Sequence, residues 1–269
     1  MATTSQKSSS DGDHFYTREG VPAYGAGIRE VREQGYLPSP STILKVLNKP
    51  GILRWYSKMV AEMAIDIAGD LTGIDRDDAV QKVLDATKEK SREPMELGTR
   101  IHNSAESILI GRNPAQGDPY SMGIKKFCDA NIIRTRWVEN TVKYISPEIC
   151  YAGRVDALVE HQQVGLAVLD WKSSSIKRRS KRENKPQPIF YDPYIMQLAC
   201  YSKAISGSPQ PISVAINTEA GYEGECVEKV WTDLEWARGW RMFVLAYRLW
   251  CEDRKYSPHK FCSCEEDAA

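Results

Sequence analysis

Long apolar runs and an excess of charge of one sign are both missing from this sequence of 269 residues. No apolar stretch reaches the roughly 18 residues that a membrane-spanning helix needs, so we expect no membrane partner. Lysine plus arginine equal aspartate plus glutamate at 36 each, which gives a formal net charge of zero. Attraction to a polyanion must therefore come from a local basic segment and not from the whole chain.

Targeting segments and cysteine motifs are also scarce. The first 20 residues lack the apolar core of a secretory signal and the arginine-rich character of a transit peptide. The seven cysteines form no Cys-x-x-Cys pair, which argues against a zinc ribbon, and their odd number does not suit a disulfide framework. Cys251, Cys262 and Cys264 lie near the C-terminus, but their spacing fits no iron–sulfur ligand run. We expect an intracellular, reducing compartment and no iron–sulfur cluster.

Several common catalytic motifs are absent. The chain has no G-x-x-x-x-G-K-[ST], no G-x-S-x-G and no H-E-x-x-H, and the Gly25-Ala26-Gly27 stretch lacks the third glycine of a dinucleotide turn. These absences argue against a nucleotide-driven machine, a serine hydrolase and a zinc protease.

The first half of the chain has helical character. Residues 1–35 are rich in glycine, serine and charge, and we expect a flexible leader there. From Pro40 the pattern predicts a short helix, a break at Lys49-Pro50-Gly51 and a longer helix that ends near Gly69. Acidic starts and lysine-rich or glycine ends predict further helices over residues 75–90, 96–110 and 121–133.

The second half changes to short β-branched and aromatic runs. Strands are predicted in TRWVENTVKYIS, EICYAGRVDALVEH and VGLAVLDWKSSS, followed by a helix in PYIMQLACYSKAISG, strands in PISVAINT and CVEKVWT, and a helix over 233–251. This order predicts an α/β fold, with a mixed central sheet, flanking helices and an N-terminal helical extension. We expect helices over 36–135 to wrap an α/β core over 136–253, as one compact unit, with a tail over 254–269.

Two aspartates and a lysine carry the clearest chemical signal. Side chains alternate along a strand, so Asp170 and Lys172 point the same way while Trp171 points to the opposite, inner side. Asp156 lies inside another apolar segment, GRVDAL, where an unpaired carboxylate would be costly. Two such carboxylates, with the backbone carbonyl of Trp171 as a third ligand, suit Mg²⁺, for which Mn²⁺ can substitute.

The position of Lys172 then indicates phosphodiester hydrolysis. A nearby ammonium helps a metal-bound water to lose its proton and stabilises the extra negative charge on a reacting phosphate. Acid-x-lysine is common by chance, and a salt bridge at the end of a strand is the simpler interpretation of these residues alone.

Four elements in order resemble a known family. GRVD followed by VLDWKSS is similar to the split signature of PD-(D/E)xK nucleases, in particular their RecB-like branch. Upstream, GTRIHNSAESIL resembles the helical histidine motif of that branch, with His102 as the matching residue. Downstream, QLACY resembles its Q-x-x-x-Y motif, with Gln197 and Tyr201. The likeness is greatest to the mitochondrial genome maintenance exonucleases and their phage relatives, and it covers about residues 37–206.

The resemblance implies roles for these residues. Asp156 and Asp170 would bind metal and Lys172 would assist catalysis. A glutamate before the first core strand often completes such a site; Glu148 and Glu139 both fit, and we prefer Glu148 because it is nearer to Asp156 in the sequence. The remaining expected roles are a further metal ligand for His102 and contacts with Lys172 or the substrate backbone for Gln197 and Tyr201.

A basic segment follows the predicted strand of Asp170. Beside a phosphodiesterase site it favours contact with nucleic-acid phosphates, although a solvated loop or a nuclear-localisation signal has the same composition. The basic residues are Lys177, Arg178, Arg179, Lys181, Arg182 and Lys185. Candidate stacking platforms for unpaired bases are Trp55, Tyr56, Trp137, Tyr191 and Tyr194.

We therefore expect a metal-dependent DNA exonuclease that acts on single-stranded ends in DNA replication, repair or recombination. The alternatives are a structure-specific endonuclease with the same site, and a nucleic-acid-binding subunit whose site is vestigial. The family likeness favours the cytoplasm of a bacterial or phage-infected cell, with a mitochondrion or nucleus as alternatives.

Overall fold

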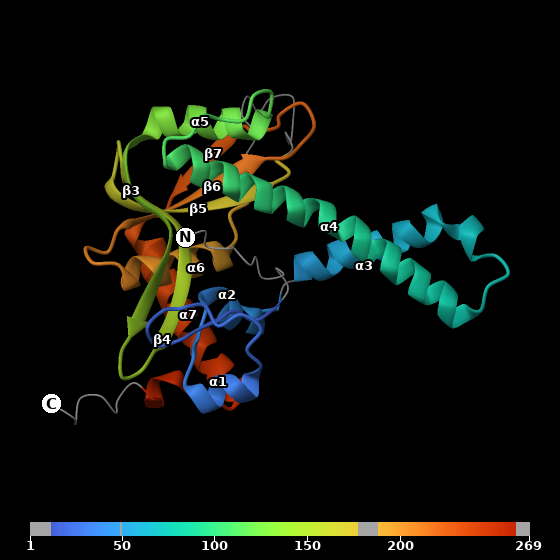
Figure 1. Ribbon diagram of the computed structural model, residues 1–269, viewed down its shortest axis with the longest axis horizontal. Coiled ribbons are helices and arrows are strands. Elements are labelled where there is room, and N and C mark those ends of the chain that lie inside the picture. Colours follow the sequence, from blue (N-terminus) through green and yellow to red (C-terminus); the bar gives the residue numbers. More distant parts are fainter. Residues whose placement is uncertain (1–11, 49, 177–187, 262–269) are drawn as a thin grey trace, which may run out of the picture. The chain divides into compact units, whose positions relative to one another are not determined.

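The computed structural model describes residues 12–48, 50–176 and 188–261 (Figure 1). Its contacts divide the chain into two units: residues up to 46 together with those from 101 onward, and residues 47–100. The single compact unit expected over residues 36–253 stays a prediction.

The smaller unit is helical. It contains α3 (Pro50–Asp66), a 3₁₀ turn η2 (Ala68–Leu71) and the first part of α4 (Arg76–Leu109). The sequence predicts two helices over residues 75–90 and 96–110, but α4 is one continuous helix with Pro94 inside it. Proline removes one backbone hydrogen bond and usually kinks or breaks a helix, which is why the pattern favours an interruption there. Within the described residues, no helix is long and apolar enough to cross a membrane.

The larger unit begins with a small N-terminal subdomain. A two-residue strand β1 (Phe15–Tyr16) pairs antiparallel with β2 (Leu37–Pro38), and α1 (Ile28–Gln34) lies between them in the sequence. Next come α2 (Pro40–Ile43) and a 3₁₀ turn η1 (Leu44–Val46). Phe15, Tyr16 and Val31 are buried, so residues 12–35 have more structure than the flexible leader predicted over 1–35. Residues 1–11 lie outside the described part of the chain.

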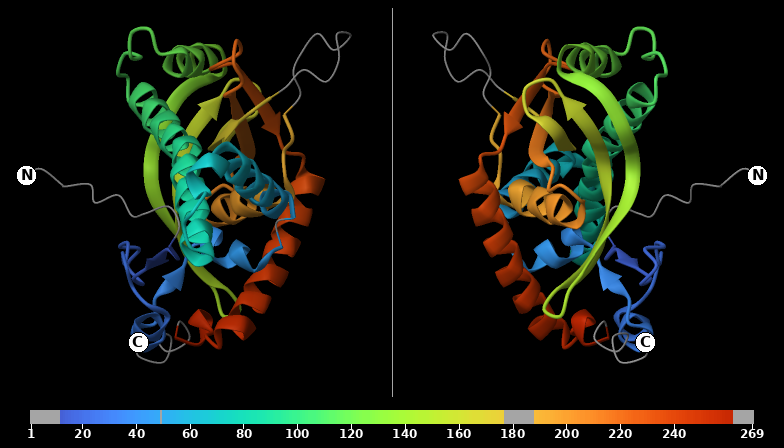
Figure 2. Two further views of the ribbon diagram at one scale, coloured as in Figure 1. Left: turned by 90° about the vertical axis from the view of Figure 1, so that its right-hand side faces the viewer. Right: turned by 90° about the vertical axis from the view of Figure 1, so that its left-hand side faces the viewer.

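A five-stranded mixed sheet forms the centre of this unit. Its strands are β3 (Ile132–Ile145), β4 (Cys150–His161), β5 (Gly165–Ser174), β6 (Gln210–Asn217) and β7 (Cys226–Val230), in that spatial order. All neighbours are antiparallel except β5 and β6, which are parallel. Parallel neighbours need a crossover connection, and α6 (Asp192–Ala204) supplies it. Figure 2 shows β3 and β4 as a long, strongly twisted ribbon.

Helices cover both faces of this sheet. Figure 1 shows α5 (Pro119–Asn131) on one side of β5, β6 and β7, and α6 with α7 (Asp233–Arg254) on the other. On the α5 side, Trp171 is 1% exposed and meets Phe127 edge-on at a ring-centroid distance of 5.7 Å. On the α6 side, Val168 packs in a core with Ile195 and Leu198. The described chain confirms the predicted mixed sheet with flanking helices after N-terminal helices, and a short 3₁₀ turn η3 (Pro258–Phe261) follows α7.

Candidate metal and catalytic site

Asp170 and Lys172 form a close pair near the end of β5. Lys172 Nζ donates a hydrogen bond to Asp170 Oδ1 at 2.8 Å and lies 2.7 Å from Oδ2. The Asp170 side chain is 3% exposed, and its burial raises the pKa of the carboxyl, an effect that the Lys172 ammonium opposes. Burial would lower the pKa of Lys172, but the Asp170 and Asp156 carboxylates outweigh it and the pKa is raised. The lysine therefore keeps its charge at neutral pH.

Asp156 lies where β4 and β5 separate. Their paired residues end at Ala157 and Leu169, so the next strand residues no longer exchange backbone hydrogen bonds. In this gap Asp156 Oδ2 accepts a hydrogen bond from the backbone N–H of Trp171 at 2.8 Å. Burial would raise the pKa of Asp156, but the charges of His102 and Lys172 and this N–H outweigh it and lower the pKa.

His102 reaches the same carboxylate from α4. Ile101 and Ala105 of that helix are fully buried, which orients the helix and directs His102 toward β4. His102 Nδ1 is 3.5 Å from Asp156 Oδ2. Burial would lower the pKa of His102, but the Asp156 carboxylate outweighs it and the pKa is raised. His102, the residue that matches the histidine motif, belongs to the end of α4 that lies in the larger unit.

Glu139 of β3 completes a three-residue group. His102, Glu139 and Asp156 each offer one ligand atom, and these atoms all lie within 4.8 Å of one another. Val138 pairs with Ala157 and Asn140 with Val155, so Glu139 lies opposite Asp156 across the ribbon.

The local environment of Glu139 is unusual for a strand residue. Its φ is 49°, in the left-handed region, which costs roughly 1–3 kcal/mol for a non-glycine residue and tends to occur at functional sites. Arg154 Nε lies 2.5 Å from Glu139 Oε2. Burial raises the pKa of Glu139, and the charges of Asp156 and Glu106 raise it further.

Glu148, the preferred glutamate from the sequence, lies elsewhere. Its side chain is 75% exposed and forms an ion pair with Arg248 at 3.5 Å. The structure therefore brings Glu139 to the group and not Glu148. Sequence distance does not predict this proximity, because antiparallel pairing of β3 with β4 brings residues 139 and 156 together across the turn.

The Q-x-x-x-Y residues lie together on α6. Gln197 Nε2 donates a hydrogen bond to Tyr201 Oη at 3.0 Å, and Tyr201 is 4% exposed. The contact with Lys172 comes from a third residue of that helix, because the Tyr194 ring centroid lies 5.2 Å from Lys172 Nζ. Tyr191 meets Tyr194 edge-on at 5.7 Å and is 54% exposed. Contact of Gln197 and Tyr201 with a substrate stays a prediction.

The remaining predicted site residues are Trp171, the aromatic stacking candidates and the basic segment. The side chain of Trp171 points inward as predicted, and the use of its carbonyl as a metal ligand stays a prediction. Trp137 packs partly buried against the core beside α6, whereas Trp55 and Tyr56 in the smaller unit are 49% and 40% exposed. The predicted phosphate-binding residues Lys177, Arg178, Arg179, Lys181, Arg182 and Lys185 lie outside the described residues, as do Cys262 and Cys264.

The sequence interpretation missed two partners in this region. Arg154, two residues before Asp156 in GRVD, shares its strand face and holds Glu139. Tyr194, named only as a stacking candidate, contacts Lys172. The alternation of GRVD could have indicated Arg154, but nothing in the sequence pattern singles out Tyr194 from the other aromatic residues of the chain.

The donor set fits a hard divalent cation. One imidazole nitrogen and two carboxylate oxygens converge in the three-residue group, and Mg²⁺ and Mn²⁺ favour such oxygen-rich sites. Close by, Asp170 Oδ2 is buried and lacks a hydrogen-bond donor of good geometry among the described residues, since its contact with Lys172 is an ion pair. A cation beside it would compensate that oxygen.

Comparison with known proteins yields no family assignment: no protein-family model matches this chain, and no curated protein matches it.

Proposed function

We propose that this protein is a metal-dependent DNA exonuclease of the PD-(D/E)xK type, in the RecB-like branch, which hydrolyses phosphodiester bonds at single-stranded ends. The observation that carries the proposal is the convergence of His102, Glu139 and Asp156 within 4.8 Å, beside the Asp170–Lys172 pair. Five chemically suited residues from α4, β3, β4 and β5 meet in one place, although they are up to 70 positions apart in the sequence.

The fold gives further support to the proposal. The PD-(D/E)xK resemblance implies a mixed central sheet flanked by helices, and β3 to β7 form such a sheet. The resemblance also implies a histidine on an upstream helix and a glutamine and tyrosine on the helix that follows the lysine strand. His102 lies on α4, and Gln197 and Tyr201 lie on α6.

Each side chain has a role in this chemistry. His102, Glu139, Asp156 and Asp170 would hold one or more Mg²⁺ ions, for which Mn²⁺ can substitute. A bound divalent ion would supply Lewis-acid activation of water and of the phosphodiester. Lys172 carries a positive charge held in place by Asp170 and by the Tyr194 ring, so it can stabilise the negative charge that develops on the reacting phosphate.

The test is digestion of end-labelled DNA by the purified full chain with Mg²⁺ or Mn²⁺. Linear single strands, linear duplex and circular single strands are compared, each also with EDTA. We expect metal-dependent loss of linear single strands and intact circles. Cleavage of the circles would contradict exonuclease action and favour the endonuclease alternative, and binding without any hydrolysis would favour the vestigial site.

A matched pair of variants ties the activity to this site. Asp170→Asn removes the buried carboxylate charge, and we expect it to abolish hydrolysis. Asp129→Asn changes an exposed aspartate on α5 that pairs with Lys125, and we expect activity equal to that of the wild type. Full activity of Asp170→Asn would contradict the assignment of the site.

A further inference from the structure

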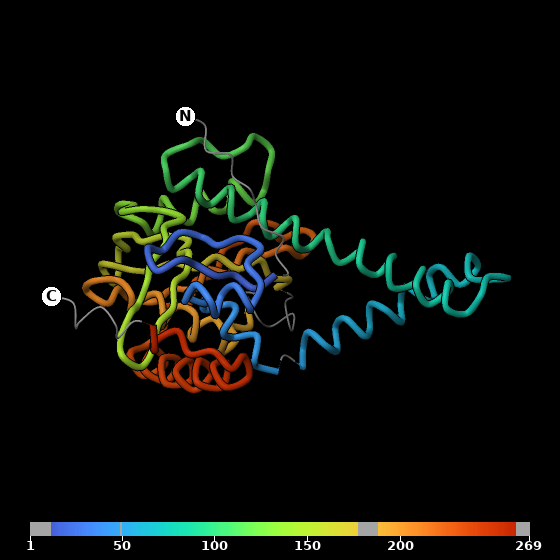
Figure 3. Tube along the Cα trace, turned by 60° about the horizontal axis from the view of Figure 1, so that its bottom comes forward, coloured from blue at the N-terminus to red at the C-terminus, as the bar shows by residue number. Residues whose placement is uncertain are grey.

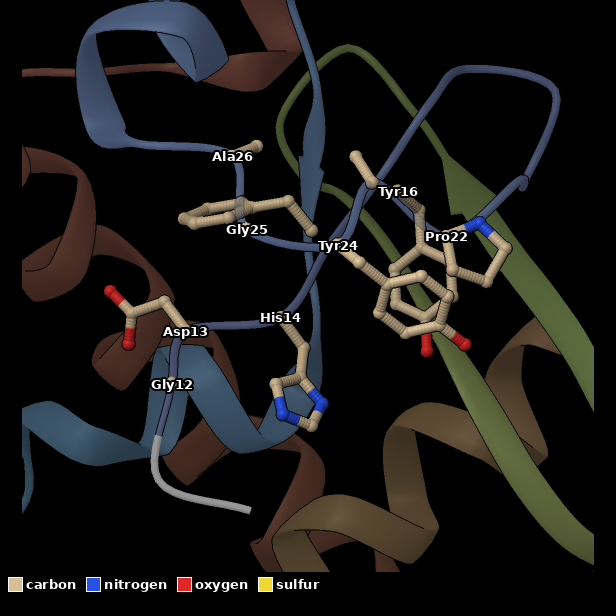
Figure 4. Close-up of a pocket in the computed structure, with 10 residues that line it drawn as sticks. Gly12, Asp13, His14, Tyr16, Pro22, Tyr24, Gly25 and Ala26 are labelled. Carbon is tan, nitrogen blue, oxygen red and sulfur yellow. The ribbon is translucent and has the colours of Figure 1, made fainter. Parts of the chain in front are cut away.

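A cavity of about 400 Å³ lies in the N-terminal subdomain, lined by residues 12–16 and 22–26. We call it the N-terminal pocket. Figure 4 shows the side chains of His14, Tyr16 and Tyr24 projecting to the same side of this segment, with the two phenol groups close together. Its volume lies within the range of roughly 300–1,000 Å³ that is typical of small-molecule sites.

The groups that project into this pocket are neutral and aromatic. Burial and the nearby Lys45 ammonium lower the pKa of His14, so its imidazole is uncharged at pH 7. Asp13 forms ion pairs with Lys45 at 3.0 Å and Arg254 at 3.8 Å. In Figure 4 its carboxylate points away from the two tyrosines. Two phenols and a neutral imidazole suit a flat, uncharged heterocycle better than a phosphate, because they supply ring faces and hydrogen bonds without positive charge.

The pocket segment lies along the ribbon that carries the candidate site. Lys143 Nζ of β3 donates a hydrogen bond to the Arg18 carbonyl at 3.0 Å, and a methyl group built on Gly20 would lie 3.5 Å from Thr141 Cγ2. Figure 3 shows the N-terminal segment beside the β3–β4 ribbon. Thr141 is two residues beyond Glu139, so the loop that joins the two halves of the pocket lining contacts β3 close to the candidate metal site.

The pocket and Asp156 are also on one face of β4. Tyr16 belongs to a buried cluster with Ala152. Residues 152, 154 and 156 are every second residue of β4, so their side chains lie on the same face of the strand. The four residues from Ala152 to Asp156 span about 13 Å along β4. Tyr16, which packs on Ala152, is therefore within reach of a DNA strand bound at Asp156. Arg154 lies between the two positions and is held by Glu139.

We propose that the N-terminal pocket is a nucleobase subsite, in which a base near the phosphate bound through the divalent ion that His102, Glu139 and Asp156 would hold stacks on Tyr24. This inference rests on the proposed function, since it takes a DNA strand as the ligand of the site. Both tyrosines line the pocket; Tyr24 is 56% exposed, so its ring is accessible to a ligand, whereas Tyr16 is 6% exposed. The pocket would recognise any base by its ring face and would not select a sequence.

The experiment measures binding without hydrolysis. Full-chain protein with Ca²⁺ in place of Mg²⁺, under conditions in which the strand stays intact, is titrated into a fluorescently labelled hexathymidylate, and into versions with one abasic residue at each position in turn. For the wild type we expect one position where base loss weakens binding by about tenfold, the effect of losing one stacked base. Tyr24→Ala should weaken binding of the intact strand by a similar factor and be insensitive to base loss at that position.

Matched controls separate stacking from damage to the fold. Tyr24→Phe keeps the ring, and Val21→Ala changes a 58% exposed neighbour outside the lining residues, so both should bind like the wild type. Free thymidine should compete with the intact strand better than orthophosphate does. Equal sensitivity of the wild type and Tyr24→Ala to base loss at every position would overturn the proposal, and so would competition by orthophosphate alone.

The subsite and the proposed function can fail separately. If the wild type hydrolyses linear strands but binds every abasic strand equally well, the nuclease proposal stands and the nucleobase subsite is wrong. Tyr24-dependent binding of one base, without metal-dependent hydrolysis, would retain the pocket as a nucleobase site and remove the nuclease proposal.

Discussion

Asp156 takes the place of a strand partner for Trp171. Its Oδ2 atom accepts the Trp171 backbone N–H at 2.8 Å, immediately beyond the last paired residues of β4 and β5. The same oxygen lies 3.5 Å from His102 Nδ1. One carboxylate therefore satisfies a backbone donor where the sheet opens and also faces the histidine of the candidate metal site, so it serves both the fold and the candidate site.

Two substitutions at Asp156 should separate these roles. Asp156→Asn keeps an oxygen that can accept the Trp171 N–H, whereas Asp156→Ala leaves this donor without a partner. We expect Asp156→Ala to be less stable than Asp156→Asn by about 1–3 kcal/mol, measured by urea unfolding in EDTA. Both variants should lose metal-dependent hydrolysis. Equal stability of the two would contradict the structural role of the carboxylate.

The choice between the two glutamates gives a second test. Glu139→Gln should lower the affinity for Mn²⁺ by at least tenfold, measured by isothermal titration calorimetry, because a carboxylate ligand becomes a neutral amide. Glu148→Gln should bind Mn²⁺ like the wild type, since Glu148 is exposed beside Arg248. The reverse order would restore Glu148 as the ligand.

Removal of Lys172 should destabilise the fold as well as the reaction. Lys172→Met leaves the Asp170 carboxylate buried without its ammonium partner, which we expect to cost about 3 kcal/mol in the free energy of unfolding. The double variant Asp170→Asn/Lys172→Met removes both charges and should recover most of this loss, while it stays inactive. Additive effects of the two single substitutions would show that the pair is not coupled.

The His102–Asp156 pair should make stability depend on pH in metal-free protein. The pKa of folded His102 is raised above its ordinary value of 6.5, because the Asp156 carboxylate outweighs burial. Its contribution to stability is therefore complete below pH 6.5 and disappears as pH rises through the raised pKa. The difference in urea unfolding free energy between wild type and His102→Gln should fall over that range.

His259 provides a control of opposite sign. Its pKa is lowered by burial and by Lys260, so protonation of the folded state is disfavoured. The difference between wild type and His259→Gln should therefore grow as pH rises toward 6.5. The same pH trend for both histidines would contradict the assigned causes.

Much of the fold could be predicted because the strands of the sheet have recognisable patterns of apolar residues. The runs around Asp156 and Asp170 alternate or are fully apolar, and each became a strand of the mixed sheet. Asp170 and Lys172 share a face because side chains alternate along a strand. The sequence did not reveal that Phe15 and Tyr16 are buried, because two aromatic residues in a polar segment have no period from which a strand can be inferred.

The position of Glu139 was not readable, for two physical reasons. Its proximity to Asp156 depends on the register of β3 against β4, which tertiary packing decides. Its left-handed backbone is unfavourable for glutamate, so residue propensities argue against the conformation that it adopts. At the interior Pro94 of α4, too, the helix continues against the local preference of the residue.

The backbone of Glu139 has a consequence for the evolution of this position. At φ 49° alanine should be less stable than glycine by about 1–2 kcal/mol, the reverse of their order in an ordinary strand. Glu139→Gly and Glu139→Ala lack the carboxylate equally, so urea unfolding of the two variants isolates the backbone contribution. We expect Glu139→Gly to be more stable than Glu139→Ala, although neither variant keeps the metal ligand. That result would mean that the backbone at position 139 favours glycine, whereas the site needs an acid. Position 139 would then be a trade-off between stability and activity confined to one residue.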